Sequence, residues 1–125
     1  MNAKRAILLS LAMMLTAVVA VGETPAPPLT KVESKQVCMI NEQYFEKEQI
    51  PVEVDGKTYF GCCSMCKDRL ANDPESRFAV DPVSGKQVDK ATAVIAADAD
   101  GRVAFFENEK NLKAYNKRAV KKSKG

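Results

Sequence analysis

The sequence predicts an α+β protein made of two small units in tandem, each a β-hairpin followed by a short helix. Three observations support this prediction: two β-prone segments that surround an Asp-Gly pair, a helix-forming stretch after each segment, and a partial match between the two when the chain is shifted by 45 residues. A chain of 125 residues is long enough for one small domain or two very small ones.

The first hairpin is predicted at "IPVEVDGKTYF", where apolar and polar residues alternate around Asp55-Gly56. An Asp-Gly pair between β-prone flanks is a strong hairpin signal because both residues accept a positive φ. Strands are expected at about 51–54 and 57–61. The next stretch, "CCSMCKDRLANDPE", has helix-forming composition and ends at a proline, so a helix is expected over roughly 63–72.

The second hairpin and helix are predicted about one unit length later. "ATAVIAADADGRVAFF" places apolar residues on both sides of Asp100-Gly101, and "ENEKNLKAYNKRA" has the composition of a second helix. The shift of 45 residues pairs Gly56 with Gly101, Phe60 with Phe105, Cys62 with Glu107 and Cys66 with Asn111, and a shift of 46 pairs Cys38 with Ser84. All four cysteines therefore belong to the first unit.

The chain begins with a segment that is typical of a secretory signal. In "MNAKRAILLSLAMMLTAVVAVGETPAPP", Lys4 and Arg5 precede an apolar run from Ala6 to Val21 that ends in small residues. We assign residues 1–22 to a signal peptide and expect an exported protein, periplasmic in a bacterium or secreted. The run is shorter than the roughly 20 residues that span a bilayer, so no membrane contact is expected after cleavage, and an uncleaved anchor is the alternative.

Between the signal and the first unit, "ETPAPPLTKVESK" is Pro-rich and polar, which predicts an extended linker at 23–35 without a core of its own. Ordered structure is expected to start near Gln36. The remaining divisions are the first unit at 36–80, the second unit at 81–118 and a basic tail at 119–125. Six basic residues and no acid lie between Lys113 and Gly125, and we favour a solvated, frayed end over binding to nucleic acid or lipid.

Four cysteines carry the chemistry that the sequence suggests: Cys38, Cys62, Cys63 and Cys66. In a helix, residues four apart share a face, so Cys62 and Cys66 should point the same way, with Cys63 beside Cys66 at a spacing of three. Cys38 can reach them across the hairpin. The positive end of a helix favours the thiolate, which both coordinates metals and attacks disulfides.

A metal site is the favoured interpretation of these thiols. Thiolates select soft ions such as Cu(I) and Zn(II). The four cysteines could close a tetrahedral zinc site, whereas three of them suffice for Cu(I). We expect one soft metal ion, Cu(I) first and Zn(II) second, bound through Cys38, Cys62 and Cys66. Cys63 is expected as a fourth or exchange ligand, and the metal is expected to pass to a partner by ligand exchange. Met39 and Met65 each stand beside a cysteine and would favour copper as thioether ligands, but ordinary apolar packing is the favoured expectation for both.

Two other interpretations of the cysteines stay open. In an exported chain, four cysteines suggest two disulfides that staple an interaction module, but three of them crowd one helical turn, where a bridge closes only a very short loop. The C-x-x-C of "CSMC" suggests a thiol-disulfide redox protein that uses Cys63 and Cys66, although the βαβ context of such motifs is missing.

The sequence does not predict an enzyme. The chain has no histidine, and no acidic pair stands near the thiols at a spacing that suggests general acid-base chemistry. It also has no Gly-rich phosphate loop. We therefore expect a binding protein, with a metal ion as its partner and no nucleic acid.

The segment "GKTYFGCCSMCKDRLANDPESRF" resembles the second half of YHS domains and of the related TRASH domains, in which an aromatic pair leads to C-x3-C, a lysine and a short amphipathic helix. The resemblance places Cys62 and Cys66 on the paired cysteines of the family. It also places Cys38, in "VCMI", on the first cysteine of the family, without the usual Asp-Pro before it and glycine after it. Cys63 has no counterpart in the motif.

The segment "DPVSGKQVDKATA" resembles the opening of the same family, where a cysteine and a methionine normally stand at the places of Ser84 and Lys86. The resemblance therefore implies two copies, the second degenerate, each with a small fold likened to zinc ribbons or treble clefs. It further implies a role in sensing, carrying or handling heavy metals, chiefly copper. We expect a monomer, with a metal-transport protein or a cuproprotein as its partner.

Overall fold

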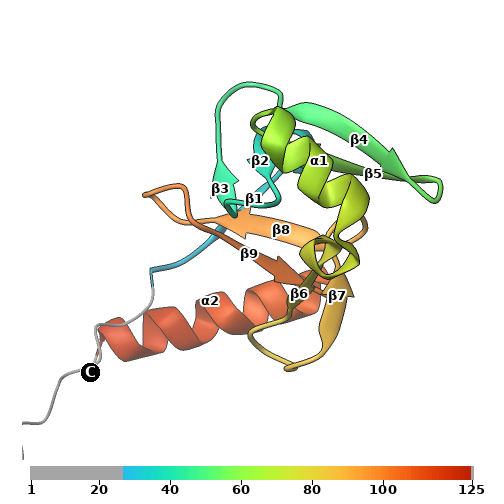
Figure 1. The fold of residues 1–125 in the computed structure, drawn as a ribbon. Helices are drawn as coiled ribbons and strands as arrows, with labels where there is room; N and C mark the ends of the chain where they lie inside the picture. Colours follow the sequence, from blue (N-terminus) through green and yellow to red (C-terminus); the bar gives the residue numbers. More distant parts are fainter. Residues whose placement is uncertain (1–26, 125) are drawn as a thin grey trace, which may run out of the picture.

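Two antiparallel hairpins, each followed by a helix, organise the computed structural model, which describes residues 27–124 (Figure 1). The predicted α+β class is confirmed, with small antiparallel sheets and two α-helices. The elements are β1 (Thr30–Val32), the 3-10 turn η1 (Ser34–Gln36), β2 (Val37–Cys38), β3 (Gln43–Tyr44), β4 (Ile50–Val54), β5 (Lys57–Gly61), α1 (Ser64–Asn72), η2 (Pro74–Arg77), β6 (Phe78–Val80), β7 (Gln87–Asp89), β8 (Val94–Ala97), β9 (Val103–Phe106) and α2 (Glu109–Ser123). The predicted signal segment, residues 1–22, lies outside the described residues.

The hairpin β4–β5 and helix α1 form as the sequence predicts. Asp55 and Gly56 both take a positive φ, 50° and 76°, which the tight turn between the paired residues Val54 and Lys57 requires. Helix α1 starts one residue after the predicted position and ends at the predicted residue, since a proline follows two positions later. This hairpin contacts α1 along both strands.

The predicted linker at 23–35 contains a strand. Strand β1 pairs antiparallel with β8, so the sheet order is β1-β8-β9. Leu29, just before β1, is buried, and its backbone N–H and C=O both bond the side chain of Asn116 in α2, each at 2.8 Å. The expectation that structure begins near Gln36 was wrong because the edge of β8 would otherwise leave backbone groups unpaired, and β1 satisfies them.

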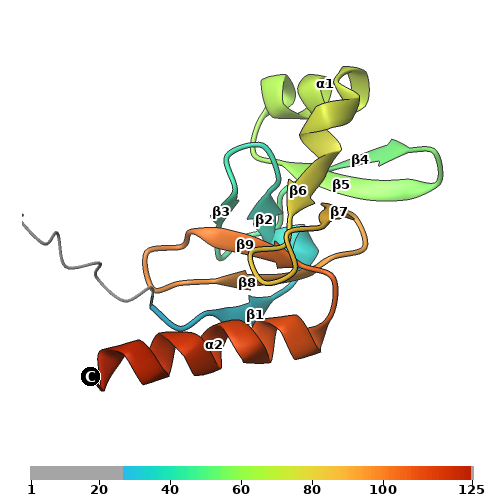
Figure 2. The ribbon, with the colours of Figure 1, turned by 90° about the horizontal axis from the view of Figure 1, so that it is seen from below.

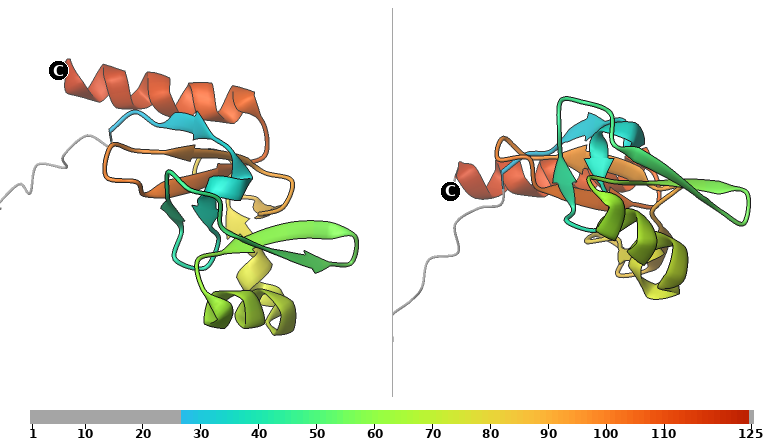
Figure 3. Two further views of the ribbon diagram at one scale, coloured as in Figure 1. Left: turned by 90° about the horizontal axis from the view of Figure 1, so that it is seen from above. Right: turned by 45° about the horizontal axis from the view of Figure 1, so that its top comes forward.

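The three-stranded sheet is buried on both faces. Alternate residues of β8 and β9 point to opposite sides, so Ile95 and Phe105 enter one core while Ala96 and Phe106 enter another. Figures 2 and 3 show α2 along one face of this sheet and the first hairpin with α1 beyond the other face. The larger core joins residues of both halves of the chain: Val37, Met39, Val52, Tyr59, Leu70, Val88, Ile95 and Phe105.

The structure also differs from the predicted divisions at 80/81 and at 119. Strand β6 pairs with β7 across the first boundary, so the two halves are joined by a hairpin as well as by a shared core. Helix α2 continues through Ser123, and Ala119 within the expected tail is buried. The helix extends because Leu112, Tyr115 and Ala119 repeat at helical spacing. Leu112 and Tyr115 pack in the smaller core and Ala119 is buried, a pattern that the many lysines of this segment made hard to recognise.

The described residues contain no membrane-crossing helix, since neither α1 nor α2 has both the length and the apolar character that a bilayer requires. The predicted role of the apolar segment at residues 6–21 stays a prediction, because that segment lies outside residues 27–124.

Candidate metal centre

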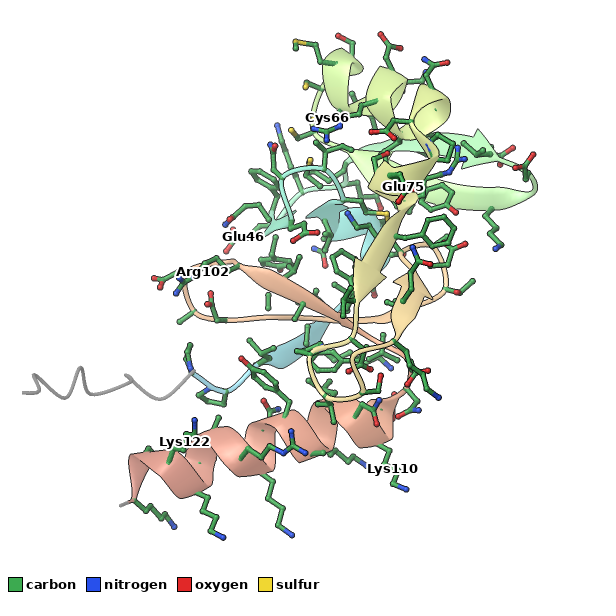
Figure 4. The ribbon with its side chains drawn as sticks, turned by 60° about the horizontal axis from the view of Figure 1, so that its bottom comes forward. Glu46, Cys66, Glu75, Arg102, Lys110 and Lys122 are labelled. Carbon is green, nitrogen blue, oxygen red and sulfur yellow. The ribbon has the colours of Figure 1, made fainter. Side chains whose placement is uncertain are left out.

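Three elements bring three sulfur atoms together at the start of α1. Cys38 ends β2, Cys62 follows β5, and Cys66 lies in the first turn of α1. The Sγ atoms of these cysteines all lie within 4.8 Å of one another. Figure 4 shows Cys66 at the end of the molecule away from α2. The predicted convergence of Cys38 on the other two thiols is confirmed, and these three residues are positioned to hold a metal ion.

Cys66 is the central member of the cluster. Its Sγ lies 3.8 Å from that of Cys38, 3.6 Å from that of Cys62 and 3.4 Å from that of Cys63. All four cysteines are free thiols. Cys63 is exposed and stands outside the group of three mutually close sulfurs. Cys63, the fourth predicted ligand, therefore lies on the solvent side of the cluster, where its sulfur contacts that of Cys66.

Close packing of the hairpin against α1 creates this geometry. A Cβ added to Gly61 would lie 2.9 Å from the Cβ of Cys66, so only glycine lets the end of β5 approach the helix this closely. The backbone N–H of Met39 donates to the carbonyl of Phe60 at 2.9 Å, which fixes the segment after Cys38 against β5. Cys38 is thereby held across the hairpin from Cys66.

Backbone N–H groups surround the buried sulfur of Cys38. The N–H of Asn41 donates to this sulfur at 3.5 Å, and the N–H groups of Cys62 and Ile40 act on its pKa. Burial raises the pKa of the Cys38 thiol, but the N–H of Asn41, followed by the Cys62 side chain and the other two N–H groups, lowers this pKa below its ordinary value. The site therefore favours a thiolate at Cys38.

The other three thiols differ in their readiness to lose a proton. Burial, with smaller contributions from the three neighbouring sulfurs, raises the pKa of Cys66 to about 12. The hydrogen bond to Cys38 raises the pKa of Cys62, whereas the backbone N–H of Cys66 lowers the pKa of Cys63. A metal ion would have to displace protons from Cys62 and Cys66, so its binding would release protons and depend on pH.

Two polar residues that the sequence analysis did not identify support the cluster. The side-chain amide of Asn41 donates to the Sγ of Cys62 at 3.3 Å. Lys90, of which only 4% is exposed, donates from Nζ to the carbonyl of Met39 at 2.7 Å and pairs with Glu42 at 3.2 Å. Lys90 comes from the second half of the chain, so the second half holds the segment that carries Cys38. No local sequence pattern indicates such a distant contact.

The two methionines beside the cysteines behave differently. Met39 is fully buried in the larger core, which confirms the expected apolar packing. Met65 is 80% exposed, so the same expectation was wrong for it. Met65 lies on the outer side of the first turn of α1, where it borders a shallow hollow of about 300 Å³. The hollow is lined by Ile40, Asn41, Cys63, Met65, Cys66 and Arg69.

The matching region of the second half contains a buried carboxylate. Asp81 accepts backbone N–H groups from Val83 at 2.7 Å, Ser84 at 3.1 Å and Glu107 at 2.8 Å. The side-chain amide of Asn111 also donates to it at 2.8 Å. Glu107 and Asn111 are the residues that the 45-residue shift matches to Cys62 and Cys66.

Comparison with known proteins identifies no relative: the chain matches no protein-family model, no curated protein and no solved structure. The class that the fold and the site define is an α+β protein with a cluster of free cysteines able to hold a metal ion. Any more specific function is inferred from the geometry of this cluster and from the resemblance of its sequence.

Proposed function

We propose that the protein binds one soft metal ion, Cu(I) in preference to Zn(II), through the thiolates of Cys38, Cys62 and Cys66. It would serve in the carriage or sensing of this metal, or in resistance to it, outside the cytoplasm. The observation that carries the proposal is the convergence of three sulfurs, from three different elements, within 4.8 Å of one another. Thiolates are the protein ligands that best select soft ions.

The sulfur positions are suited to a shared ion. In a tetrahedral site with metal-sulfur bonds of 2.3 Å, the sulfurs stand about 3.8 Å apart. The Sγ of Cys66 lies 3.8 Å from that of Cys38 and 3.6 Å from that of Cys62, so little movement would be needed. Structural zinc sites use four ligands, whereas this group has three, with the fourth thiol on its exposed side. This count favours Cu(I).

The resemblance to YHS and TRASH domains supports the same metal. It covers the three clustered cysteines and leaves Cys63 as an addition of this chain. Under this proposal the first half is a zinc-ribbon-like metal unit and the second half a degenerate copy that completes the core. The signal-like segment at residues 1–22 supports export, and the natural partner would be a metal transporter or a cuproprotein.

The test is native mass spectrometry of the reduced protein after addition of Cu(I) without oxygen. One bound copper is expected for the wild-type chain, and none for Cys66→Ser, because that variant removes the central sulfur. Cys63→Ser should still bind one copper. Failure of the reduced wild-type protein to retain any metal would contradict the proposal. A mass lower by about four hydrogens in protein from its own compartment would instead indicate two disulfides.

A thiol-disulfide redox protein is the second candidate. The exposed Cys63 and the buried Cys66 form a C-x-x-C pair at a helix start, with their sulfurs 3.4 Å apart. A reduction potential in the range of known oxidoreductases, together with turnover of a disulfide substrate, would favour this candidate over the metal carrier.

A further inference from the structure

Cys63 occupies the start of α1, a position where helices favour Ser, Thr, Asp or Asn. It is the N-cap of α1, yet its side chain makes no capping bond. The N-cap of α2 is Asn108, 45 residues after Cys63, and its backbone is nearly the same: φ −160° and ψ 170°, against −153° and 172° at Cys63. Asn108 accepts the N–H of Asn111 at 2.9 Å. The side chain of Cys63 makes no such capping bond, and its sulfur contacts the sulfur of Cys66 at 3.4 Å instead.

The surface beside Cys63 is open to a partner molecule. Cys63 and the buried Cys66 both line the shallow hollow of about 300 Å³, so the hollow connects solvent with the central sulfur of the cluster. Its rim carries Met65, which is 80% exposed, and the partly buried Ile40. Arg69 is the one charged residue in this lining.

We propose that Cys63 binds the metal transiently as it enters or leaves the three-sulfur site. The hollow would then be the place where a cysteine thiolate of a partner protein reaches the metal. This inference rests on the proposed metal binding. Cys63 is the one thiol of the four that is exposed, and it touches the sulfur that contacts all the others. An ion can therefore move from the buried set toward solvent without being released into water.

The transfer is an exchange of ligands without a change of oxidation state. Bonds from the ion to the sulfurs of Cys38 and Cys62 break, while a bond to Cys63 forms and the bond to Cys66 is kept. The thiols of Cys63 and of the partner each lose a proton to solvent as their sulfurs bond the ion. The bonds to Cys63 and Cys66 break last, as partner sulfurs replace them, and each thiolate of the protein takes up a proton from solvent when it leaves the ion. No oxidant or reductant takes part.

The chemistry of the rim favours a thiolate on a protein surface. Arg69 pairs through Nε with Asp73 at 3.6 Å, and its remaining guanidinium N–H groups can attract an incoming anion, since no carboxylate is among the residues that line the hollow. Met65 offers a flexible, polarizable contact to an apolar partner surface, as methionines do at adaptable interfaces. A partner with a cysteine set in an apolar surface would fit both features.

The first test compares transfer rates of copper-loaded wild type and Cys63→Ser to a synthetic peptide that carries C-x-x-C. Serine is a good N-cap, so the variant should fold at least as well as the wild type. We expect its copper affinity to stay within about tenfold of the wild-type value and its transfer to slow by at least about tenfold. The control is Lys67→Gln, an exposed change on the same helix outside the hollow.

The outcomes separate this inference from the function on which it rests. If the wild type binds no copper, the proposed function itself fails. If the wild type binds copper and Cys63→Ser transfers it as fast, the metal site stands and the exchange role of Cys63 is refuted.

The second test examines the docking surface with Met65→Gln. Transfer to the peptide should slow, whereas transfer to dithiothreitol, which has no protein surface, should be unchanged. Val120→Gln, which likewise replaces an exposed apolar side chain by glutamine but on α2, is the control and should alter neither rate. Equal rates of peptide transfer for Met65→Gln and wild type would rule out the hollow as a docking surface.

Discussion

A buried hydrogen-bond acceptor lies near the start of each α-helix, Cys38 near α1 and Asp81 near α2. Asp81 accepts N–H groups from the residues two and three positions later, Val83 and Ser84, and from Glu107, which follows β9. In the first half, the N–H of Asn41, three positions after Cys38, donates to the sulfur at 3.5 Å, and the N–H groups of Ile40 and Cys62 also lower the pKa of this thiol. In both halves, backbone N–H groups from the loops before the helix thus favour a negative charge on one buried acceptor.

The two halves differ in how this arrangement is completed. In the second half, the side chain of Asn111 donates to Asp81, and the carboxylate has four donors in all. In the first half, the residue at the place of Asn111 is Cys66, whose thiol is a much weaker donor. The acceptor of the second half is therefore fully hydrogen-bonded without a ligand, whereas under the proposed function the first half would gain its strongest interactions from an ion bonded to the sulfurs. Metal binding should accordingly raise the stability of the whole protein, because the halves share a core.

The largest effect is expected from Cys38→Asp, which gives the first half a carboxylate acceptor like that of Asp81 in the second half. The carboxylate should accept the same N–H groups and preserve the fold, while copper binding is lost because a hard oxygen replaces a soft sulfur. Cys38→Ala should lose copper and also be less stable by about 1–3 kcal/mol, since it leaves buried donors unpaired. Copper titration and chemical denaturation of both variants check this. Equal stability of the two variants would break the correspondence between Cys38 and Asp81.

The next effect concerns the acceptor of the second half. Asp81→Ala removes a fully buried carboxylate with four donors, and the free energy of unfolding should fall by about 3 kcal/mol. Chemical denaturation gives this value directly. Asp100→Ala, at an exposed aspartate paired with Arg102, is the control and should cost less than about 1 kcal/mol. A small loss for Asp81→Ala would mean that the hydrogen-bonded cluster does not stabilise the second half.

A smaller effect is expected from Lys90→Met, which tests how the second half supports the first. The variant keeps the apolar stem of Lys90 but loses the bonds to the carbonyl of Met39 and to Glu42. The segment after Cys38 should loosen, and copper affinity should fall about tenfold. Lys86→Met, at an exposed lysine, should leave the affinity unchanged. Unaltered affinity in Lys90→Met would show that Lys90 does not position Cys38.

The smallest effect lies in the acid limb of the stability curve. Burial tends to raise the pKa of Asp81, but the bonds from Asn111, Glu107, Val83 and Ser84 lower it below the ordinary 3.8. The carboxylate therefore contributes stability that is complete above about pH 4 and is lost as the pH falls through the lowered pKa. Asp81→Asn should flatten this limb, as measured by unfolding of the metal-free protein between about pH 5 and 2. A limb of unchanged slope would refute the contribution of Asp81.

The local parts of the structure were predictable from the sequence, and the long-range parts were not. The Asp55-Gly56 turn and the α1 boundaries depend on neighbouring residues, so their positions follow from local patterns. The pairing of β1 with β8 and the contact of Lys90 with Met39 join residues far apart in the chain. Such contacts depend on the assembled core, which no local pattern specifies.

For the candidate site, the clustering of the thiols was predictable from the sequence, but the role of Asp81 was not. The spacing of Cys62 and Cys66 predicted that both thiols lie on one face of a helix, which was wrong for Cys62, because α1 begins at Ser64 and the extended N-cap Cys63 separates Cys62 from it. The two sulfurs still meet at 3.6 Å, and the structure confirms that Cys38 joins them. Matching Cys38 to Ser84 missed its structural counterpart Asp81, which stands three residues earlier. The two residues share only the ability to accept hydrogen bonds as anions, and a comparison of residue types does not detect that property.

The most direct test of the central claim is X-ray absorption spectroscopy at the copper edge of the anaerobically loaded protein. We predict Cu(I) with three sulfur neighbours at one distance, and loss of this shell in Cys66→Ser. A first shell of nitrogen or oxygen atoms, or a spectrum that Cys66→Ser leaves unchanged, would contradict the assignment of Cys38, Cys62 and Cys66 as the metal ligands.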